Sequence, residues 1–283
     1  SRLSVIGAGV MAEAIIAGVI ERDLLPAASI IASHPRAERR SALMEKYGIE
    51  ATASNADAAR RGDVIVLGIK PQVMPGVLRE LHGGLAPEKL VVSIIAGATT
   101  QTLRDGLDHP ALVRVMPNTP AQIGEGVNIW YATPETTEAH REQARALLGA
   151  LGHELQVGDE RFVAMATAVS GTGPTYVFLV MEALIDSAVH LGFPRHLAHD
   201  LVLETIKGSV AFAERTQKHP AQLRDMVTSP GGTSAAAFYE LERGRLRTVL
   251  ADAVWAAYRR TMSLSESLSA GKDPEPMAPR SDS

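Results

Sequence analysis

Residues 3–12, which read LSVIGAGVMA, decide the fold of this chain. The first four have strand character and run directly into a glycine-rich turn, after which an apolar helical pattern begins. Gly7 permits the turn, Gly9 lets the backbone approach a pyrophosphate, and Ala12 is small enough for the helix to lie on the sheet. Unpaired N–H groups and the positive end of the helix dipole favour an anion here. The stretch predicts a dinucleotide-binding turn; a plain strand–helix turn without a ligand is the alternative.

The composition is that of a chain with one large domain or two ordinary ones, because it has 283 residues of which 46% are hydrophobic. A formal net charge of −4 gives no polyanion-binding signature, so nucleic acid is not an expected partner. The absence of cysteine excludes disulfides, thiolate catalysis and cysteine-ligated metals, and no metal site is expected. The apolar start is interpreted as a strand and not as a signal peptide, so the expected setting is the cytoplasm.

One stretch, residues 176–193, is apolar enough to be considered as a membrane span. Glu182, Asp186 and His190 form a single polar stripe along it, which favours a buried helix of a soluble protein over a helix in a bilayer. The helix is apolar on most of its circumference, and one small helical domain could hardly cover it. We therefore expect a helical core shared between subunits, and no membrane partner.

Further apolar runs alternate with helical patterns through the first half of the chain, at residues 30–32, 64–67, 90–94, 112–115 and 127–130. Short runs rich in Val and Ile and separated by helices predict a doubly wound parallel sheet, hence an α/β fold. Ligands of such sheets bind beyond the carboxyl ends of the strands. The residues that follow each run are therefore the candidate site.

The end of the second predicted strand bears on the choice of cofactor. It reads Ser33-His34-Pro35-Arg36, with no carboxylate to bind the ribose 2′-OH of NAD. A hydroxyl and a guanidinium suit a 2′-phosphate instead, so NADPH is favoured over NADH. The alternative is that Ser33 caps the next helix and Arg36 is a solvated residue of its first turn.

Three other segments near strand ends are candidates for ligand contact. Gly68, before Ile69, Lys70 and Pro71, allows close approach of the backbone, and Lys70 either contacts the cofactor or is merely solvated. Asn55 is interpreted first as a helix N-cap and second as a contact to adenosine. Residues 116–120, MPNTP, form either a rigid hydrogen-bonding loop near the nicotinamide or a rigid turn without ligand contact.

The second half contains no further strand pattern, and we place the domain boundary near residue 160. Residues 170–174, SGTGP, are expected to break the chain and open a long helix at Thr175. Further helices are expected at residues 194–218 and after Gly244. Between them residues 225–234 form a loop entering a helix, which suits a small carboxylate, with an ordinary capped helix as the alternative.

Four motifs in this order and at these separations resemble the pyrroline-5-carboxylate reductase family: GAGVMA at 7–12, MPNTP at 116–120, SGTGP at 170–174 and SPGGT at 229–233. The resemblance covers residues 3 to about 268. It implies a Rossmann domain over residues 1–159 followed by an all-α dimerisation domain over residues 160–268, with dimers that can assemble into decamers. The implied reaction is reduction of 1-pyrroline-5-carboxylate to L-proline by NADPH, or less favourably NADH.

The resemblance also implies residue roles. It places Gly7, Gly9, Val10 and Met11 at the pyrophosphate, Ser33 and Arg36 near the 2′-phosphate, and Asn55 near the adenosine. It places Gly68, Ile69, Lys70 and Ala96 along the cofactor toward the nicotinamide. It lines the substrate pocket with Glu160, Val227, Gly232, Thr233 and Ser234. Ser234 stands where the family commonly has threonine; it keeps the hydroxyl and is the expected donor to the imine nitrogen.

Two other readings of the sequence are weaker. In β-hydroxyacid dehydrogenases a catalytic lysine follows the second glycine motif, whereas residues 174–206 contain no lysine. A non-enzymatic NADPH sensor would have no use for the SPGGT loop. A reductase of an imine with another ring size is harder to separate by sequence. Residues 269–283 are expected to be a disordered tail.

Overall fold

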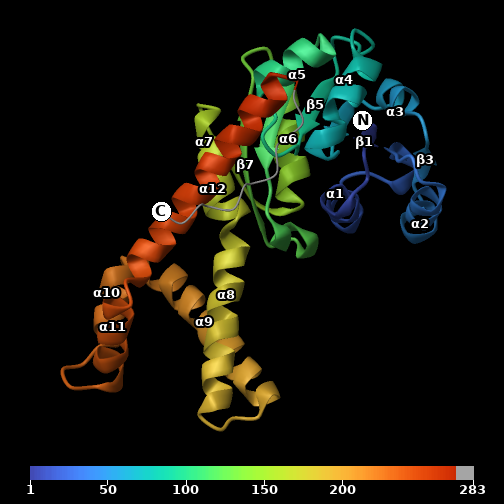
Figure 1. The fold of residues 1–283 in the computed structure, drawn as a ribbon. Helices are drawn as coiled ribbons and strands as arrows, with labels where there is room; N and C mark the ends of the chain where they lie inside the picture. Colours follow the sequence, from blue (N-terminus) through green and yellow to red (C-terminus); the bar gives the residue numbers. More distant parts are fainter. Residues whose placement is uncertain (272–283) are drawn as a thin grey trace. The chain divides into compact units, whose positions relative to one another are not determined.

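The computed structural model describes residues 1–271 and divides into two compact units (Figure 1). The first unit comprises residues 1–172 together with the chain from Ala256 onward, and the second comprises Gly173–Trp255. The predicted disordered tail, residues 269–283, lies outside the described residues from position 272 onward, and its first residue, Ser269, is instead the last residue of a helix, α12 (Leu246–Ser269).

An eight-stranded sheet forms the first unit, with strand order β3-β2-β1-β4-β5-β6-β7-β8. The strands are β1 (Leu3–Ile6), β2 (Ile30–Ser33), β3 (Glu50–Thr52), β4 (Val64–Leu67), β5 (Leu90–Ser93), β6 (Leu112–Met116), β7 (Gly126–Ala132) and β8 (Gly152–Gln156). The first six follow the 3-2-1-4-5-6 order of a dinucleotide-binding sheet, as the sequence predicts. β3, half-exposed and without an apolar run, is not among the strands that we predict from the sequence.

The expectation of an all-parallel sheet is wrong at one strand, because β7 pairs antiparallel with β6. The connection between them is a single 3₁₀ helix, η3 (Thr119–Ile123), with a few flanking residues. A parallel crossover needs a dozen or more residues, so a chain turned back this quickly can only pair antiparallel. β8 then pairs parallel with β7 through the crossover helix α6 (Glu138–Gly149).

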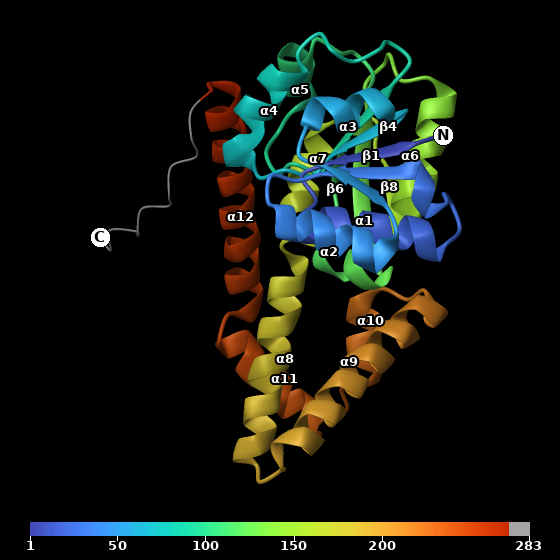
Figure 2. The ribbon, with the colours of Figure 1, turned by 90° about the vertical axis from the view of Figure 1, so that its right-hand side faces the viewer.

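Helices cover both faces of the sheet (Figure 2). One face packs against α1 (Val10–Glu21), α2 (Ala37–Tyr47) and α6. The other packs against α3 (Asn55–Arg61), α4 (Met74–Leu81), α5 (Thr100–Leu107) and Leu268 of the last helix. Alternate residues of each strand enter the two cores, which is why β1, β4 and β5 are buried along their whole length and are apolar except at Ser4 and Ser93. Two 3₁₀ turns, η1 (Ala27–Ser29) and η2 (Pro71–Val73), complete this part.

The chain does not break at residues 170–174, contrary to expectation. Helix α7 (Arg161–Ala166) continues through one π-helical turn, η4 (Thr167–Gly171), into α8 (Gly173–His190). The N–H of Thr172 reaches the Thr167 carbonyl at 2.8 Å, the five-residue spacing of a π turn. By length and composition this continuous run, Arg161–His190, is the one helix among residues 1–271 that could cross a membrane, and 17% of its apolar window is buried.

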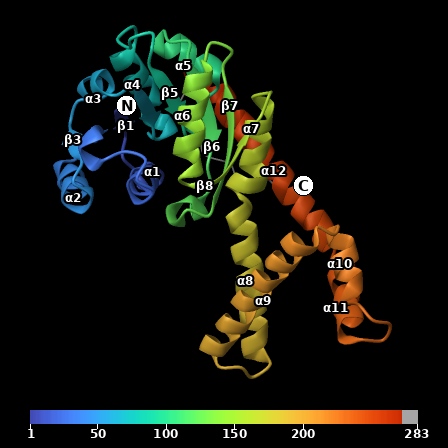
Figure 3. The same cartoon turned by 180° about the vertical axis from the view of Figure 1, so that it is seen from behind.

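The second unit is helical, as predicted. It contains α8, then α9 (Arg195–Thr216), α10 (Pro220–Met226), α11 (Thr233–Arg243) and the first part of α12 (Leu246–Ser269). α8 and α9 pack on each other (Figure 3). Within residues 173–255 only Ala198 and Val202 are buried, and α8 has no buried side chain. The expectation that one chain alone cannot cover these helices is therefore met.

The domain boundary predicted from the sequence and the boundary between the two compact units lie about twelve residues apart. The predicted boundary lies near residue 160, whereas the compact units divide after Thr172. The reason is packing: Val163, Ala164 and Ala168 are buried, and α7 contacts β6 and β7. The last part of α12 likewise belongs to the first unit.

Candidate functional site

The glycine-rich turn after β1 has the geometry that close approach to a ligand requires. Gly7 has φ +81°, and a Cβ there would lie 2.3 Å from Ile69 Cγ2. A Cβ on Gly68 would lie 2.7 Å from Ala12 Cβ, so these two small residues set the spacing of α1 and β4. Gly9 is the N-cap of α1, carries no capping side chain and has open space where its Cβ would be. The fit to a bound pyrophosphate is therefore good.

Val10 and Met11 open α1 beside this turn. Val10 is 65% exposed, and Met11 is half-buried against the core. Their backbone N–H groups belong to the first turn of α1, which has no intrahelical acceptors for them.

At the end of β2, Ser33 has no exposed surface, and its hydroxyl donates to Asn55 Oδ1 at 2.8 Å. In this conformation Ser33 cannot itself touch a phosphate; it orients Asn55. Asn55 Nδ2 donates in turn to Glu80 Oε2 at 2.8 Å. The first interpretation of Asn55 as an N-cap is wrong, because Ser54 caps α3 by accepting from the Asp57 N–H. Asn55 is the first residue of the helix, and its side chain points to neighbouring elements.

Three arginines follow β2 and have different surroundings. Arg39 donates to the Ala8 carbonyl at 3.0 Å and pairs with Glu13 at 2.5 Å, so it joins α2 to the glycine turn and to α1. Arg40 donates to the carbonyls of His34 and Pro35, both at 2.8 Å. Arg36 is exposed at the N-terminus of α2. Of the three, Arg36 is thus the guanidinium available to a 2′-phosphate.

The local field at this strand end is positive. Burial and the neighbouring Arg36 lower the pKa of His34, whose Nδ1 accepts the Arg36 N–H at 3.2 Å. Burial raises the pKa of Glu13, but hydrogen bonds from Lys46, Arg39 and Tyr47 outweigh it and lower the pKa to about 2. Glu13 is therefore a fixed anion that ties α1 to α2.

The ends of β4 and β5 supply the remaining predicted cofactor residues. Ile69 is half-buried and packs on the core, while Lys70 is exposed and precedes Pro71, the first residue of η2, as expected of a proline there. Ala96 is half-buried in the loop that leads from β5 to α5.

The loop after β6 is held internally. Asn118 is 9% exposed; its Oδ1 accepts the Val127 N–H at 2.9 Å and its Nδ2 donates to the Ser170 carbonyl at 3.1 Å. A Cβ on Gly171 would lie 2.9 Å from Met116 Cε. The structure thus favours the rigid-turn alternative for Asn118, which fixes the π turn against the end of β6.

Glu160 lies in the first unit, before α7. Its carboxylate accepts the Thr100 N–H at 2.8 Å, the Thr100 hydroxyl at 2.7 Å and Arg114 Nη1 at 2.8 Å. The Arg114 side chain is only 5% exposed and that of Glu160 24%. Sequence reasoning missed Arg114 and Thr100; the signal was a charged residue inside the apolar run at 112–115.

The other predicted substrate residues lie in the second unit. Val227 is 66% exposed after α10, Gly231 has φ +72°, and Gly232 is the N-cap of α11 without a capping side chain. A Cβ on Gly232 would lie 2.5 Å from Ser229 Oγ, so a larger residue here would have to displace that hydroxyl. Thr233 and Ser234 are the first two residues of α11. The loop entering a helix is confirmed, and its N–H groups face no side-chain cap.

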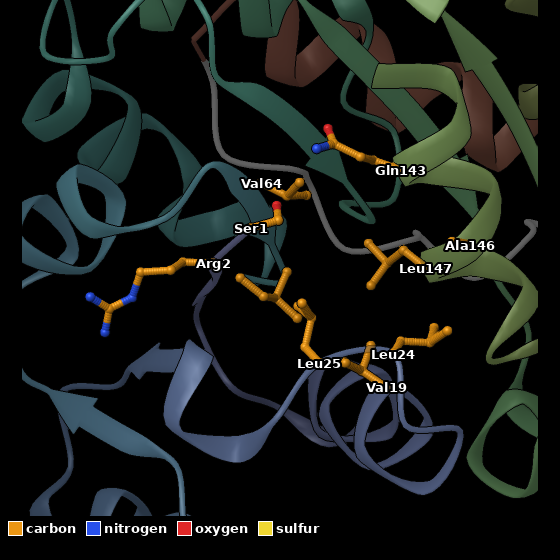
Figure 4. Close-up of a pocket in the computed structure, with 10 residues that line it drawn as sticks. Ser1, Arg2, Val19, Leu24, Leu25, Val64, Gln143, Ala146 and Leu147 are labelled. Carbon is orange, nitrogen blue, oxygen red and sulfur yellow. The ribbon is translucent and has the colours of Figure 1, made fainter. Parts of the chain in front are cut away.

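An apolar cavity of about 210 Å³ lies away from all of these residues (Figure 4). Leu3 and Val64, the first residues of β1 and β4, line it together with Val19 of α1 and Leu147 of α6. It is therefore at the amino edge of the sheet, opposite to the edge where such folds bind dinucleotides. Among residues 1–271 there is no group of three or more His, Asp or Glu side chains that could hold a metal ion.

Comparisons with known proteins agree with the architecture. Residues 160–264 match the family model described as pyrroline-5-carboxylate reductase dimerisation. Residues 2–97 match the model described as NADP oxidoreductase coenzyme F420-dependent.

Relatives match along nearly the whole chain. Pyrroline-5-carboxylate reductase of Pseudomonas aeruginosa is 41% identical over 268 residues, 94% of this chain and 98% of the relative. That of Synechocystis is 40% identical over 265 residues, with coverages of 94% and 98%. The crystal structure of Plasmodium falciparum pyrroline carboxylate reductase with NADP bound superposes with a TM-score of 0.86 at 30% identity, covering 93% of this chain and 98% of that one.

Proposed function

The chain belongs to the pyrroline-5-carboxylate reductase family, and we propose how its residues carry out the reduction of 1-pyrroline-5-carboxylate to L-proline. The single observation that carries the proposal is a pair of helix N-termini without capping side chains, at α1 and α11. Each follows a glycine turn, and each offers N–H groups and a positive dipole end to an anion. The first suits a dinucleotide pyrophosphate, and the second suits the carboxylate of a small imino acid.

In the first unit we assign the cofactor to the carboxyl edge of the sheet. Gly7, Gly9, Val10 and Met11 contact the pyrophosphate, and when bound the reduced dinucleotide supplies the hydride. Arg36 contacts the 2′-phosphate, with Ser33 acting through Asn55, which faces the adenosine. Gly68, Ile69, Lys70 and Ala96 line the cofactor toward the nicotinamide. The exposed Arg36 and the absence of a carboxylate after β2 support NADPH as the preferred form, with NADH as the weaker one.

In the second unit we assign the substrate to the start of α11. The N–H groups of Thr233 and Ser234 bind the carboxylate, and Gly232, whose own N–H donates to the Ser229 carbonyl at 3.0 Å, forms the turn that presents them, with Val227 beside it. For Glu160, in the first unit, a contact with the substrate remains the expectation from the family resemblance. Reduction adds a hydride to the imine carbon, the electron pair of the C=N bond moves to the ring nitrogen, and that nitrogen carries one proton taken from water, before the hydride arrives as the iminium or after it as the amine. The Ser234 hydroxyl donates a hydrogen bond to that nitrogen, where it stabilises the developing charge most in the transition state.

The match to a dimerisation family implies that the chain oligomerises. We infer a homodimer in which the exposed apolar faces of α8 and α9 are covered by the same faces of a second copy, with a decamer as the higher assembly. The α8 part of the apolar run Arg161–His190 then belongs to that core and not to a membrane, and Glu182 and Asp186 within it support this assignment. The proposed setting is the cytoplasm.

The test is to incubate the purified chain with NADPH and 1-pyrroline-5-carboxylate and to follow NADPH consumption together with L-proline formation. The six-membered cyclic imine with the same carboxylate is the comparison substrate, and NADH is the comparison cofactor. We expect the five-membered ring and NADPH to give the higher kcat/KM. Faster reduction of the six-membered ring would refute the substrate assignment, and NADPH binding without turnover of either ring would favour a sensor.

A further inference from the structure

The loop between β5 and α5, residues 94–99, leaves the carboxyl edge of the sheet, where we assign the nicotinamide half of the cofactor. It contains Ala96, which we assign to the cofactor, and Gly97, whose φ is +81°. Within residues 94–99 a single backbone hydrogen bond joins two residues of the loop, from the Ala98 N–H to the Ile95 carbonyl at 3.2 Å. Because this loop has so few hydrogen bonds of its own, it needs contacts from other elements to keep one conformation.

Glu160 supplies the first of these contacts. Both of its carboxylate oxygens accept from Thr100, the first residue of α5, through the backbone N–H and the hydroxyl. A carboxylate at this place also meets the positive end of the α5 dipole. Arg114 holds the same carboxylate from β6, and its burial means that the pair is well shielded from solvent. The end of the loop that enters α5 is thus fixed by a buried ion pair.

The last turns of α12 supply the second contact. A Cβ on Gly97 would lie 3.1 Å from Leu264 Cβ and 3.4 Å from Leu268 Cδ1, so the loop lies directly on this helix. Leu268 is 4% exposed and belongs to the core formed with α4 and α5. Thr102 Oγ1 and Ser269 Oγ, 167 residues apart in the chain, lie 3.0 Å from each other. Figures 1 and 2 show this end of α12 beside α5.

The two contacts come from opposite ends of one segment. The match to the dimerisation family begins at Glu160 and ends at Leu264. Glu160 contacts Thr100, and Leu264 contacts Gly97. We propose that Glu160 and the α12 residues Leu264 and Leu268 are positioning residues that clamp the β5–α5 loop and so hold the nicotinamide half of the cofactor. The inference rests on the proposed cofactor site.

The clamp and the family-based role of Glu160 predict different kinetics. A residue that binds the imino acid affects the KM for 1-pyrroline-5-carboxylate. A residue that positions the β5–α5 loop affects the affinity for NADPH, and does so without the imine present. Both roles can be separated because the dissociation constant for NADPH is measurable on the enzyme alone, by nucleotide fluorescence or calorimetry.

The experiment uses Thr100→Val, which removes the hydroxyl donor to Glu160 at nearly constant volume and leaves the Arg114–Glu160 pair in place. Thr100→Ser keeps the hydroxyl and is its rescue control. We expect Thr100→Val to raise the Kd for NADPH about 5- to 20-fold, the loss of one hydrogen bond to a charged group, with a smaller change in the KM for the imine. Thr100→Ser stays within about twofold of the wild type.

Leu268→Ala tests the other half of the clamp, with Leu268→Met as the conservative variant. It is compared with Leu107→Ala, which truncates a fully buried side chain of the same core at the far end of α5. Both truncations lower Tm, but only Leu268→Ala weakens NADPH binding if the clamp exists. Equal Kd values for the two truncations, or a Thr100→Val variant that changes only the KM for the imine, overturns the proposal.

A failure of the proposed function gives a different pattern. A wild-type enzyme that binds NADPH but does not reduce the imine removes the function and leaves the Kd comparison intact. A wild-type enzyme that does not bind NADPH removes both, because the loop then has no cofactor to position.

Discussion

The sheet unit and the helical unit of this chain differ in how much of their own core they supply. In the first unit β1, β4 and β5 are fully buried between two layers of helices. In residues 173–255 only Ala198 and Val202 are buried, whereas Phe178, Leu179 and Leu191 are 57%, 64% and 82% exposed. Isolated exposed apolar side chains are ordinary, but a helix apolar on most faces is not. A single chain can therefore encode a complete dinucleotide-binding domain and only part of a helical core.

The largest expected effect comes from a substitution on the exposed apolar surface of the helical unit, which tests whether a second chain completes its core. Leu179→Asp places a charge on the exposed apolar surface of α8, where desolvating it in an interface is costly. We expect the oligomer to be lost, with a fall in activity of more than about 100-fold, because burying an unpaired charge costs several kcal/mol. Light scattering after size exclusion measures the mass. Met44→Asp, an exposed apolar residue of α2 in the sheet unit, is the control; a dimer that survives Leu179→Asp contradicts the shared core.

The second prediction concerns the chemistry assigned to the helical unit. Ser234→Ala removes the donor assigned to the imine nitrogen and lowers kcat/KM by about 10- to 150-fold, or about 1.5–3 kcal/mol of transition-state stabilisation. Ser234→Thr restores the hydroxyl and with it most of the activity. Steady-state kinetics with saturating NADPH make the comparison. Unchanged kinetics in the alanine variant would remove Ser234 from the mechanism.

The third prediction concerns the sheet unit. Arg36→Ala removes the exposed guanidinium after β2 and raises the KM for NADPH by about 10- to 100-fold, the strength of one charged hydrogen-bonding contact. The KM for NADH changes little, since NADH has no 2′-phosphate. Arg40→Ala is a matched control, because Arg40 donates to backbone carbonyls of the same turn. Equal effects of Arg36→Ala on the two cofactors would exclude Arg36 as the phosphate contact.

The smallest effect is a pH-dependent stability of the sheet unit. The pKa of Glu13 falls from an ordinary 4.5 to about 2 in the folded chain because of Lys46, Arg39 and Tyr47. A carboxylate whose pKa is lower in the folded state stabilises it above the unfolded pKa, and this stability is lost as the pH falls from 4.5 toward 2. Glu13→Gln should cost about 1–3 kcal/mol at neutral pH and progressively less in acid. Denaturant titrations at several pH values measure it; a pH-independent cost contradicts it.

Local patterns were sufficient for most of the secondary structure. The strand–turn–helix at residues 3–12, the strand at 64–67 and the helix of residues 194–218 are all confirmed within a few residues. Each depends on side chains that are neighbours in the sequence or recur at one period. The strand β7 was predicted, but its antiparallel direction was not, because strand direction depends on the length of the connection and not on the strand residues. The π turn was mistaken for a break because glycine and proline mark both.

Some residues of the candidate site could likewise be predicted from local sequence, and others could not. Gly7 and Gly68 can be recognised from the sequence, since only a residue without Cβ fits those two backbone positions, and Gly9 belongs to the same motif although it has open space where its Cβ would be. Arg114 could be noticed only as a charged residue inside an apolar run, and Thr100 gave no local signal, because their partner is a carboxylate 46 and 60 residues further along the chain. The burial of Ser33 and the hydrogen bonds of Asn118 to Val127 and Ser170 could likewise not be predicted from the sequence. A sequence pattern tells which groups are available, and packing decides which of them remain free.

The amino-acid sequence by itself determined an α/β dinucleotide-binding region followed by apolar helices, because periodicity, glycine spacing and charge act over a few residues. Only the tertiary structure decided that the end of α12 returns to the first unit, that Glu160 accepts the N–H of the first residue of α5, and that the Ser33 hydroxyl donates to Asn55. These depend on residues distant in sequence meeting at one edge of a sheet. Hydrogen bonds and burial at that edge are properties of the packed chain, which no local stretch contains.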